Sequence, residues 1–213
     1  MYKRQGDNVI TSLGALNRIT PDFLKENLNK NYTHLDKLKA PKVAVLIGGA
    51  TTKTEFTVKD AEELAEHLKA LKKDGASLMI TTSRRTGKVQ TALLKRELHD
   101  EDTEFWDGAG SNPYFDYLHH ADAIIVTNDS VSMATEAIAT GKPVMIADIG
   151  TQGHRIETFH CYLQENNWTK PFTGALQDWK RPVYDDMLKI SQEIATCYER
   201  FLKDGPDDTN PPQ

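Results

Sequence analysis

The stretch Ala121–Ile149, ADAIIVTNDSVSMATEAIATGKPVMIADI, has the pattern of a strand, a helix and a second strand. Ala123–Thr127 is a short run of apolar and β-branched residues, which is typical of a strand buried on both faces. Ser130 is in position to cap a helix over Val131–Thr140, whose apolar residues share one helical face. Val144–Ala147 is a second apolar run. The unit therefore predicts two parallel strands joined by a right-handed helical crossover.

The turn before this helix is the first candidate for a binding site. At the carboxyl end of a strand, backbone N–H groups and the positive end of a helix dipole face outward, and together they attract phosphate. The residues predicted to contact phosphate here are Asp129, Ser130, Val131, Ser132 and Met133.

The rest of the chain continues the alternation of strands and helices. Three further strands are predicted at Val43–Ile47, Ser77–Thr82 and Thr103–Trp106. Helices are predicted at Val58–Lys73, around Val89–Leu98, from Asn112-Pro113 onward, at Arg155–Glu165 and at Asp185–Leu202. Such alternation predicts an α/β fold with a doubly wound parallel sheet of about five strands. With the strand order 3-2-1-4-5, strands one and four are neighbours, and ligands bind beyond their carboxyl ends.

Three segments differ in their patterns. Residues 1–40 lack clean periodicity and are predicted to form a linker or lead-in arm, with a short helix within Phe23–Leu38. Residues 41–202 are predicted to form one Rossmann-like domain with C-terminal helices, in which Pro171–Trp179 is irregular. Residues 203–213 are rich in Pro and Asp and are predicted to be a disordered tail.

Composition argues against several classes of protein. The 213 residues carry a formal net charge of −5, whereas a dedicated nucleic-acid binder usually presents a broad basic face. No apolar run approaches the ~20 residues of a membrane span, and the N-terminus lacks the apolar core of a signal peptide. Cys161 and Cys197 suit reduced thiols, and no pattern supports a disulfide between them. The expected location is the cytoplasm, with peripheral contact at the inner face of a membrane left open.

Two loops at the predicted switch point are candidates for phosphate contacts. Gly48 and Gly49 follow the first strand and remove side chains where phosphates can approach the backbone, although glycine also ends many strands for local reasons. The loop after the second strand contains Ser83, Arg84 and Arg85. Together with Lys53 these residues form a predicted cationic cluster at the same edge of the sheet. Guanidinium groups match the geometry of phosphate oxygens. A solvated loop with two surface arginines is an equally good interpretation.

Two further residues are candidates for contacts to a nucleoside. Glu136 lies one to two turns into the predicted helix, where its carboxylate can accept hydrogen bonds from both hydroxyls of a ribose. An ordinary exposed glutamate is the slightly preferred interpretation. Asn112, together with Trp106, Asp107 and Tyr114, can frame a base or a sugar. In the alternative interpretation Asn112 caps a helix and the aromatic residues belong to the core.

Other cofactors and metals find less support. The segment Gly48–Lys53 lacks the G-x-G-x-x-G fingerprint, and the second strand does not end in the acidic residue that holds an NAD ribose. Arg84 and Arg85 leave binding of the NADP 2′-phosphate open. However, no Tyr is followed four residues later by Lys, the catalytic pair of short-chain reductases and sugar epimerases. His154–Cys161 contains two histidines and a cysteine but lacks a fourth ligand and a zinc spacing, so no metal site is predicted.

Several motifs resemble those of known families. Asp129-Ser-Val-Ser-Met133, Glu136-Ala137 and Gly141-Lys-Pro-Val144 resemble the C-terminal, nucleotide-sugar-binding domain of GT-B glycosyltransferases. More narrowly, the chain resembles the ELM-type (elongated-mitochondria) family of mitochondrial fission proteins, whose bacterial relatives often carry a nucleoside-diphosphate-sugar epimerase label. The segments that carry this likeness are Gly14–Arg18, Leu46–Ala50, Thr81–Thr86, Gly110–Tyr114 and Thr127–Met133.

The resemblance implies roles for some of these residues. In GT-B enzymes the donor diphosphate sits at the start of the helix that matches Val131–Thr140. A glutamate on that helix, matched here by Glu136, binds the ribose. The loop matched by Trp106–Gly108 lies near the base. The implied ligand is a nucleoside-diphosphate-sugar donor, with no tightly bound cofactor.

The leading hypothesis is a nucleotide-sugar-binding domain of a GT-B-like glycosyltransferase, with Arg84 or Arg85 and the helix start stabilising the leaving diphosphate. Because GT-B active sites lie between two domains, the resemblance implies a fragment that lacks the N-terminal acceptor domain and is inactive alone. The helix Asp185–Leu202 is then expected to pack on that domain and to be exposed without it. One alternative is a non-catalytic fission-type adaptor that uses this helix for a protein partner. The other, an NADP-dependent epimerase, has the least support.

Overall fold

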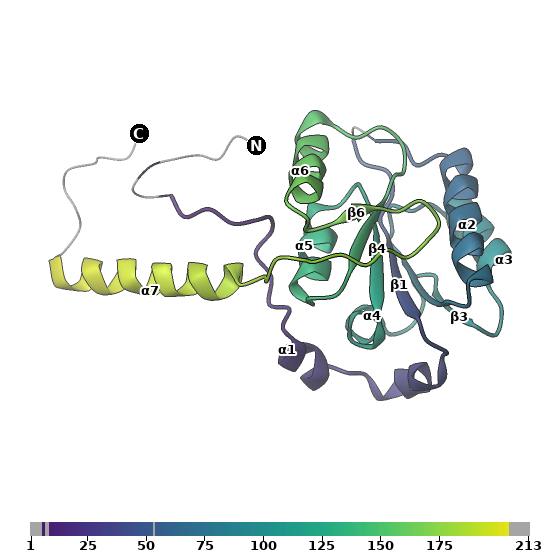
Figure 1. The fold of residues 1–213 in the computed structure, drawn as a ribbon, viewed down its shortest axis with the longest axis horizontal. Helices are drawn as coiled ribbons and strands as arrows, with labels where there is room; N and C mark the ends of the chain where they lie inside the picture. The colour runs from purple at the N-terminus through teal and green to yellow at the C-terminus, as the bar shows by residue number, and fades with distance from the viewer. Residues whose placement is uncertain (1–5, 7–8, 53, 205–213) are drawn as a thin grey trace.

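A parallel β-sheet of six strands forms the centre of the protein (Figure 1). The computed structural model describes residues 6, 9–52 and 54–204. The strands are β1 Lys42–Ile47, β2 Ser77–Thr82, β3 Thr103–Trp106, β4 Ala123–Thr127, β5 Val144–Ala147 and β6 Lys170–Pro171. Their order across the sheet is β3-β2-β1-β4-β5-β6, and every neighbouring pair is parallel. The predicted α/β class and the order 3-2-1-4-5 are confirmed.

The sixth strand was not predicted. β6 overlaps the start of a stretch expected to be irregular, and its two residues pair with Met145 and Ile146 of β5. The N–H of Phe172 then donates to the carbonyl of Ile146 at 2.8 Å. Two residues are too few to show the pattern by which strands are recognised in a sequence. Pro171, which has no N–H, is tolerated because β6 is an edge strand.

Helices connect the strands and cover both faces of the sheet (Figure 1). They are α1 Pro21–Glu26, the 3-10 helix η1 Lys30–Lys37, α2 Val58–Lys73, α3 Lys88–Leu98, α4 Tyr114–His120, α5 Val131–Ala139, α6 His154–Glu165 and α7 Asp186–Asp204. Local capping explains where several of them begin. Thr57 and Asp60 form a capping box at the start of α2, with Asp in place of the usual Glu. At α4, Asn112 Oδ1 accepts the N–H of Tyr114 at 3.0 Å, so the side chain predicted to start this helix bonds its first residue.

Side chains of each strand alternate between two hydrophobic cores. On one face, Val43, Val45 and Ile47 of β1 pack with residues of α2 and α3. On the other face, Ala44 and Leu46 pack with residues of α4, α5 and α6. Because helices cover both faces, the central strands are buried at nearly every position. This double burial is the reason that continuous apolar runs mark the strands in the sequence.

Residues of the predicted lead-in arm contribute to the second of these cores. The buried residues of the arm are Leu13, Ile19, Leu24 and Leu35. The hydroxyl of Tyr32 donates to the carbonyl of Ser111 at 2.6 Å, which ties η1 to the loop before α4. Two short helices, α1 and η1, occupy the region where one was predicted. The arm therefore packs against the domain. Its buried apolar residues are irregularly spaced, so no periodic pattern in the sequence indicated this packing.

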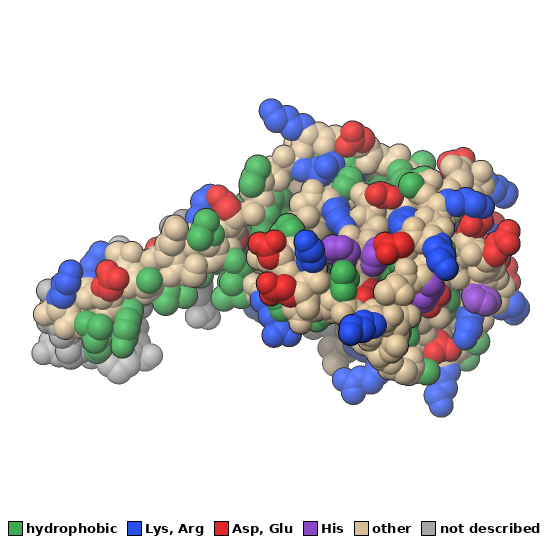
Figure 2. All heavy atoms as spheres, turned by 90° about the horizontal axis from the view of Figure 1, so that it is seen from below, with side chains coloured by type: hydrophobic (Ala, Val, Ile, Leu, Met, Phe, Trp, Pro, Cys, Tyr) green, Lys and Arg blue, Asp and Glu red, His purple; other side chains and the backbone are tan. Residues whose placement is uncertain are grey.

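The last helix, α7, leaves the domain and extends away from it (Figures 1 and 2). Its first turn is tied to the arm, since the Asp186 carboxylate accepts the N–H of Leu13. Ile190 is buried, but residues 191–203 are all exposed. The exposed large hydrophobic residues of α7 are Leu188, Ile194, Tyr198, Phe201 and Leu202. Residues 203 and 204, which were predicted to begin the disordered tail, belong to α7, and the tail from residue 205 onward lies outside the described residues.

Two further features bear on the expectations from composition. Within residues 6, 9–52 and 54–204, no helix is both long and apolar enough to cross a membrane. Cys161 on α6 and Cys197 on α7 are free thiols with exposed side chains.

Candidate functional site at the switch point of the sheet

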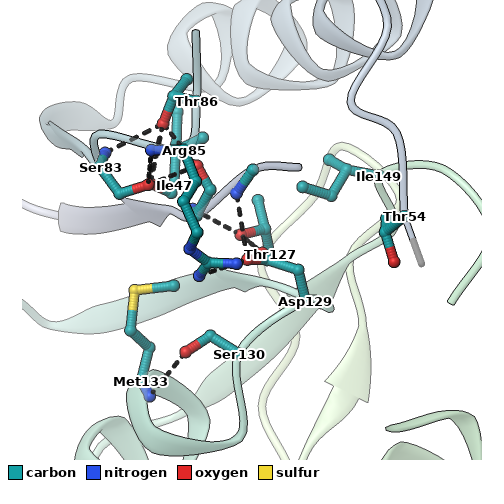
Figure 3. Close-up of polar contacts among 12 residues, drawn as sticks. Ile47, Thr54, Ser83, Arg85, Thr86, Thr127, Asp129, Ser130, Met133 and Ile149 are labelled. Carbon is teal, nitrogen blue, oxygen red and sulfur yellow. Dashed lines mark hydrogen bonds and ion pairs between the residues drawn. The ribbon is translucent and has the colours of Figure 1, made fainter. Parts of the chain in front are cut away.

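The loops at the carboxyl ends of β1, β2 and β4 meet at the switch point of the sheet (Figure 3). β1 ends in Gly48-Gly49, β2 leads into the loop 83–87, and β4 leads into the turn that begins α5. The strand order brings these loops together because β1 lies between β2 and β4. The candidate site is therefore built from three segments that are far apart in the sequence.

Asp129 joins the three segments. Its side chain is fully buried, and its carboxylate accepts the N–H of Gly49 at 3.0 Å and the hydroxyl of Thr127 at 2.6 Å. Arg85 forms an ion pair with the same carboxylate at 2.8 Å (Figure 3). A buried charge is stable only when it is paired and hydrogen-bonded. This carboxylate has both kinds of partner, which makes it the structural centre of the switch point.

The glycine pair lies against the Asp129 carboxylate. A Cβ atom on Gly48 would lie 2.1 Å from Asp129 Oδ2, so the carboxylate can approach only because the residue is glycine. Gly49 has a φ of +148°, and a Cβ there would lie 2.1 Å from the carbonyl oxygen of Arg85. The protein's own carboxylate thus occupies the place beside these glycines where the sequence predicted a phosphate. Contact of a phosphate with Gly48 and Gly49 stays a prediction.

The loop after β2 is fastened to the glycine turn by hydrogen bonds. The hydroxyls of Ser83 and Thr86 donate to the carbonyl of Gly48 at 2.8 and 2.5 Å. The N–H of Ala50 donates to the carbonyl of Arg85 at 3.0 Å. These bonds fix the backbone of the loop, so Ser83 serves the shape of the turn and Arg85 projects from a defined position.

The structure separates the two arginines that the sequence placed in one cluster. The Arg85 side chain points toward Asp129 (Figure 3), and 43% of it remains exposed. Arg84 instead lines a different cavity, beside α3. The third cation of the predicted cluster, Lys53, lies outside the described residues.

The start of α5 adds backbone donors to the site. The hydroxyl of Ser130 accepts the N–H of Met133 at 3.3 Å, which is the predicted N-cap. The N–H groups of Val131 and Ser132 belong to the first turn and have no intrahelical partner. The positive end of the helix dipole and the guanidinium of Arg85 therefore lie on the same side of the switch point (Figure 3).

Glu136 lies further along α5 and is half-buried. Its Oε2 accepts a hydrogen bond from the hydroxyl of Tyr114 at 2.5 Å. Burial, together with the nearby charge of Glu136, raises the pKa of Tyr114, so the hydroxyl stays protonated and donates. Because Asn112 bonds the N–H of Tyr114, the tyrosine links Asn112 with Glu136. The glutamate is held in place and is not an ordinary exposed residue.

Asn128 and His160 support the turn after β4, a role that the sequence reasoning missed. His160 Nε2 lies 2.9 Å from the carbonyl oxygen of Asn128. Burial lowers the pKa of His160, so we assign a neutral ring that donates from Nε2. Asn128 Oδ1 accepts the N–H of Ile149 at 3.1 Å. The sequence feature that could have indicated a buried, structural role for His160 is its position next to Phe159 on the inner face of α6.

The predicted site residues fall into three groups. Those around the switch point are Gly48, Gly49, Ser83, Arg85, Asp129, Ser130, Val131, Ser132 and Met133. Asn112 and Glu136 are joined through Tyr114. Arg84 lies apart, in the cavity beside α3. The first two groups together offer positive potential for an anion and a fixed carboxylate that can accept hydrogen bonds.

Known proteins share much of this sequence. The chain is 29% identical over 192 residues to the mitochondrial fission protein ELM1 of Arabidopsis thaliana, which covers 88% of this chain and 45% of that protein. It is 34% identical over 149 residues to the uncharacterized protein RP120 of Rickettsia prowazekii, covering 65% and 40%. The chain thus spans less than half the length of either relative.

A solved structure of MnaA from S. aureus with UDP aligns with a TM-score of 0.48 and 13% identity, over 86% of this chain and 44% of that one. A family model also matches the sequence. The model of the family named mitochondrial fission ELM1 matches residues 2–198, and the chain belongs to this family.

Proposed function

We propose that this chain is a nucleotide-sugar-binding domain of the GT-B type, and that its ligand is a nucleoside diphosphate carrying a sugar. One observation carries the proposal. A helix N-terminus and an arginine lie together at the switch point, and a fixed glutamate lies further along the same helix. Phosphate at the helix start and ribose at Glu136 would place the nucleotide along α5. Ligands of open parallel sheets commonly bind at this edge.

The diphosphate would be held by Arg85 and by the first turn of α5. A guanidinium has five N–H donors, so its ion pair with Asp129 leaves donors for phosphate oxygens. Sugar transfer leaves negative charge on the departing diphosphate, and fixed positive groups at that position lower the barrier. In this proposal Arg85 stabilises the leaving group and the N–H groups of Val131 and Ser132 assist it.

Glu136 would hold the ribose. A carboxylate has about four lone-pair sites, and the hydroxyl of Tyr114 uses only one of them. Glu136 lies six positions after Ser130, which corresponds to about 9 Å along the helix axis. The phosphate end and the ribose end of the site are therefore distinct. We place the acceptor site and the general base outside the described residues, so the chain alone is expected to bind the donor without transferring its sugar.

Calorimetric titration with UDP, GDP, ADP and NADP tests this proposal. We expect one nucleoside diphosphate to bind, and its affinity to fall about tenfold in Glu136→Gln and in Arg85→Lys, because each variant loses a hydrogen bond to a charged partner. Arg85→Lys is preferred to alanine because it retains a charge near the buried Asp129. The control is Glu193→Gln, an exposed residue of α7.

Two outcomes would contradict the proposal. One is the absence of nucleoside diphosphate binding by a correctly folded chain. The other is binding that neither Glu136→Gln nor Arg85→Lys weakens. Preferential binding of NADP would support the epimerase alternative instead.

A second candidate function is a non-catalytic adaptor, and the exposed apolar side of α7 favours it. The residues Met187, Ile190, Ile194, Cys197 and Phe201 are spaced by three and four positions, so they share one helical face, and beyond Ile190 this face is exposed. Hydrophobic side chains gather along this helix where it leaves the domain (Figure 2). The relative from Arabidopsis is named for mitochondrial fission. In this hypothesis α7 is the surface that binds a protein partner.

Charges on this face are expected to abolish partner binding without unfolding the domain. In Ile194→Glu with Phe201→Glu, the melting temperature should stay within a few degrees, since both side chains are exposed. The control, Gln192→Glu with Thr196→Glu, adds the same charge to the opposite face. Capture of partners by the immobilised chain should be lost only in the first variant and should persist in Arg85→Lys. Capture that survives on the altered apolar face would argue against the adaptor.

A further inference from the structure

We propose that the cavity beside α3 is a second site, which binds the phosphate group of a ligand separate from the one at the switch point. The cavity has a volume of about 490 Å³ and lies between the start of α3 and the loop after β3. Its polar lining includes Ser83, Arg84, Lys88, Thr91, Lys95 and Asp107. The proposal is independent of the nucleotide-sugar function, because it uses Arg84 and not Arg85.

The cavity concentrates positive charge in a chain whose net charge is −5. Arg84 comes from the loop after β2, while Lys88 and Lys95 lie seven positions apart on one side of α3. Lys95 pairs with Asp107 at 2.8 Å, which accounts for the acidic residue in the lining. Among residues 6, 9–52 and 54–204, no ion pair joins Arg84 or Lys88 to an acid. Two positive charges therefore face the cavity without a compensating carboxylate.

Backbone and hydroxyl donors lie beside these charges. α3 is 11 residues long, and its N-cap, Gly87, provides no side-chain acceptor for the first turn. The dipole of the helix adds positive potential at the same end. The hydroxyl of Thr91, one turn further along, also belongs to the lining. Arginine, lysine, hydroxyl and backbone N–H groups around one cavity match the several oxygens and the double charge of a phosphate.

An apolar groove continues from the cavity. It lies between α2 and α3 and shares Lys88 and Ala92 with the cationic cavity. Most of its surface is apolar and includes the exposed Val58 and Val89, while Glu62 and Arg96 also line it. A ligand with a phosphate and an apolar portion would fill both spaces. This chemistry is shared by small phosphorylated compounds and by the headgroup region of a phospholipid.

Titration of the full chain with pyrophosphate, followed by ¹⁵N NMR, tests the site. We expect shifts at the amides of residues 87–91. The affinity should fall about tenfold in Arg84→Ala and in Lys88→Ala, because each loses a charged hydrogen-bond donor. Both side chains are exposed, so the fold should be unaffected. The control is Lys73→Ala, which removes the same charge from the last turn of α2.

A vesicle experiment identifies the source of the phosphate. The chain is sedimented with phosphatidylcholine vesicles that contain or lack phosphatidic acid. Binding that requires phosphatidic acid and is lost in Lys88→Ala supports the site and assigns it to a lipid headgroup. Pyrophosphate binding without vesicle binding supports the site and assigns it to a small phosphorylated compound. The proposal is overturned if neither probe binds, if Arg84→Ala and Lys88→Ala bind as well as Lys73→Ala, or if the shifts are confined to the start of α5.

Discussion

Replacement of Asp129 by alanine should lower the free energy of unfolding by about 3–5 kcal/mol, the cost of breaking a buried charge pair. The variant would leave the N–H of Gly49, the hydroxyl of Thr127 and the guanidinium of Arg85 without their common acceptor. Two of these groups are buried, so water cannot replace the carboxylate without rearrangement. Urea unfolding followed by circular dichroism measures the loss.

Two comparisons isolate the buried pair as the cause. Asp129→Asn keeps the shape and one acceptor oxygen, so we expect a smaller loss of about 1–3 kcal/mol. Asp178→Ala removes a carboxylate that also pairs with an arginine, but this carboxylate is 95% exposed, and such pairs contribute at most about 1 kcal/mol. If Asp129→Ala cost no more than Asp178→Ala, Asp129 would not be the structural centre of the switch point.

Gly49→Ala is expected to destabilise the protein by about 3 kcal/mol or more, through backbone strain combined with overpacking. The new Cβ would lie 2.1 Å from the carbonyl oxygen of Arg85. That oxygen belongs to the backbone, so it cannot move aside as the end of a flexible side chain can. It also accepts the N–H of Ala50, and separation of the two loops would break this bond. Urea unfolding again provides the measurement.

Gly75→Ala is the matched control. Gly75 also has a positive φ, +92°, but its Cβ would meet nothing within 4 Å. Only the cost of the left-handed conformation applies there, about 1 kcal/mol. The difference between the two variants therefore reports the clash at the switch point. Equal losses would show that the loops can separate and that their close contact is not required for stability.

The sequence was sufficient for the fold because the signals of the fold are local. Apolar runs marked β1, β2, β4 and β5, since a strand buried on both faces needs apolar residues at nearly every position. The capping residues Thr57 and Ser130 marked helix starts, because a cap and the N–H it accepts lie within three residues. β6 was not predicted because a strand of two residues is too short to show a recognisable pattern. The alternation of the elements predicted a doubly wound parallel sheet, and the order 3-2-1-4-5 expected for it, with its switch point, is the order that the structure has.

What only the tertiary structure decided is how side chains pair at that switch point. Asp129 meets the N–H of Gly49 across 80 residues of sequence, His160 meets Asn128 across 32, and Tyr114 meets Glu136 across 22. Arg84 and Arg85 are neighbours in sequence, yet one lines the cavity beside α3 and the other pairs with Asp129. The direction of a side chain in an irregular loop depends on contacts with distant segments, and no local period encodes them. The sequence by itself therefore determined which loops form the candidate site, while the packing of those loops decided which of their charges are buried in pairs and which remain exposed.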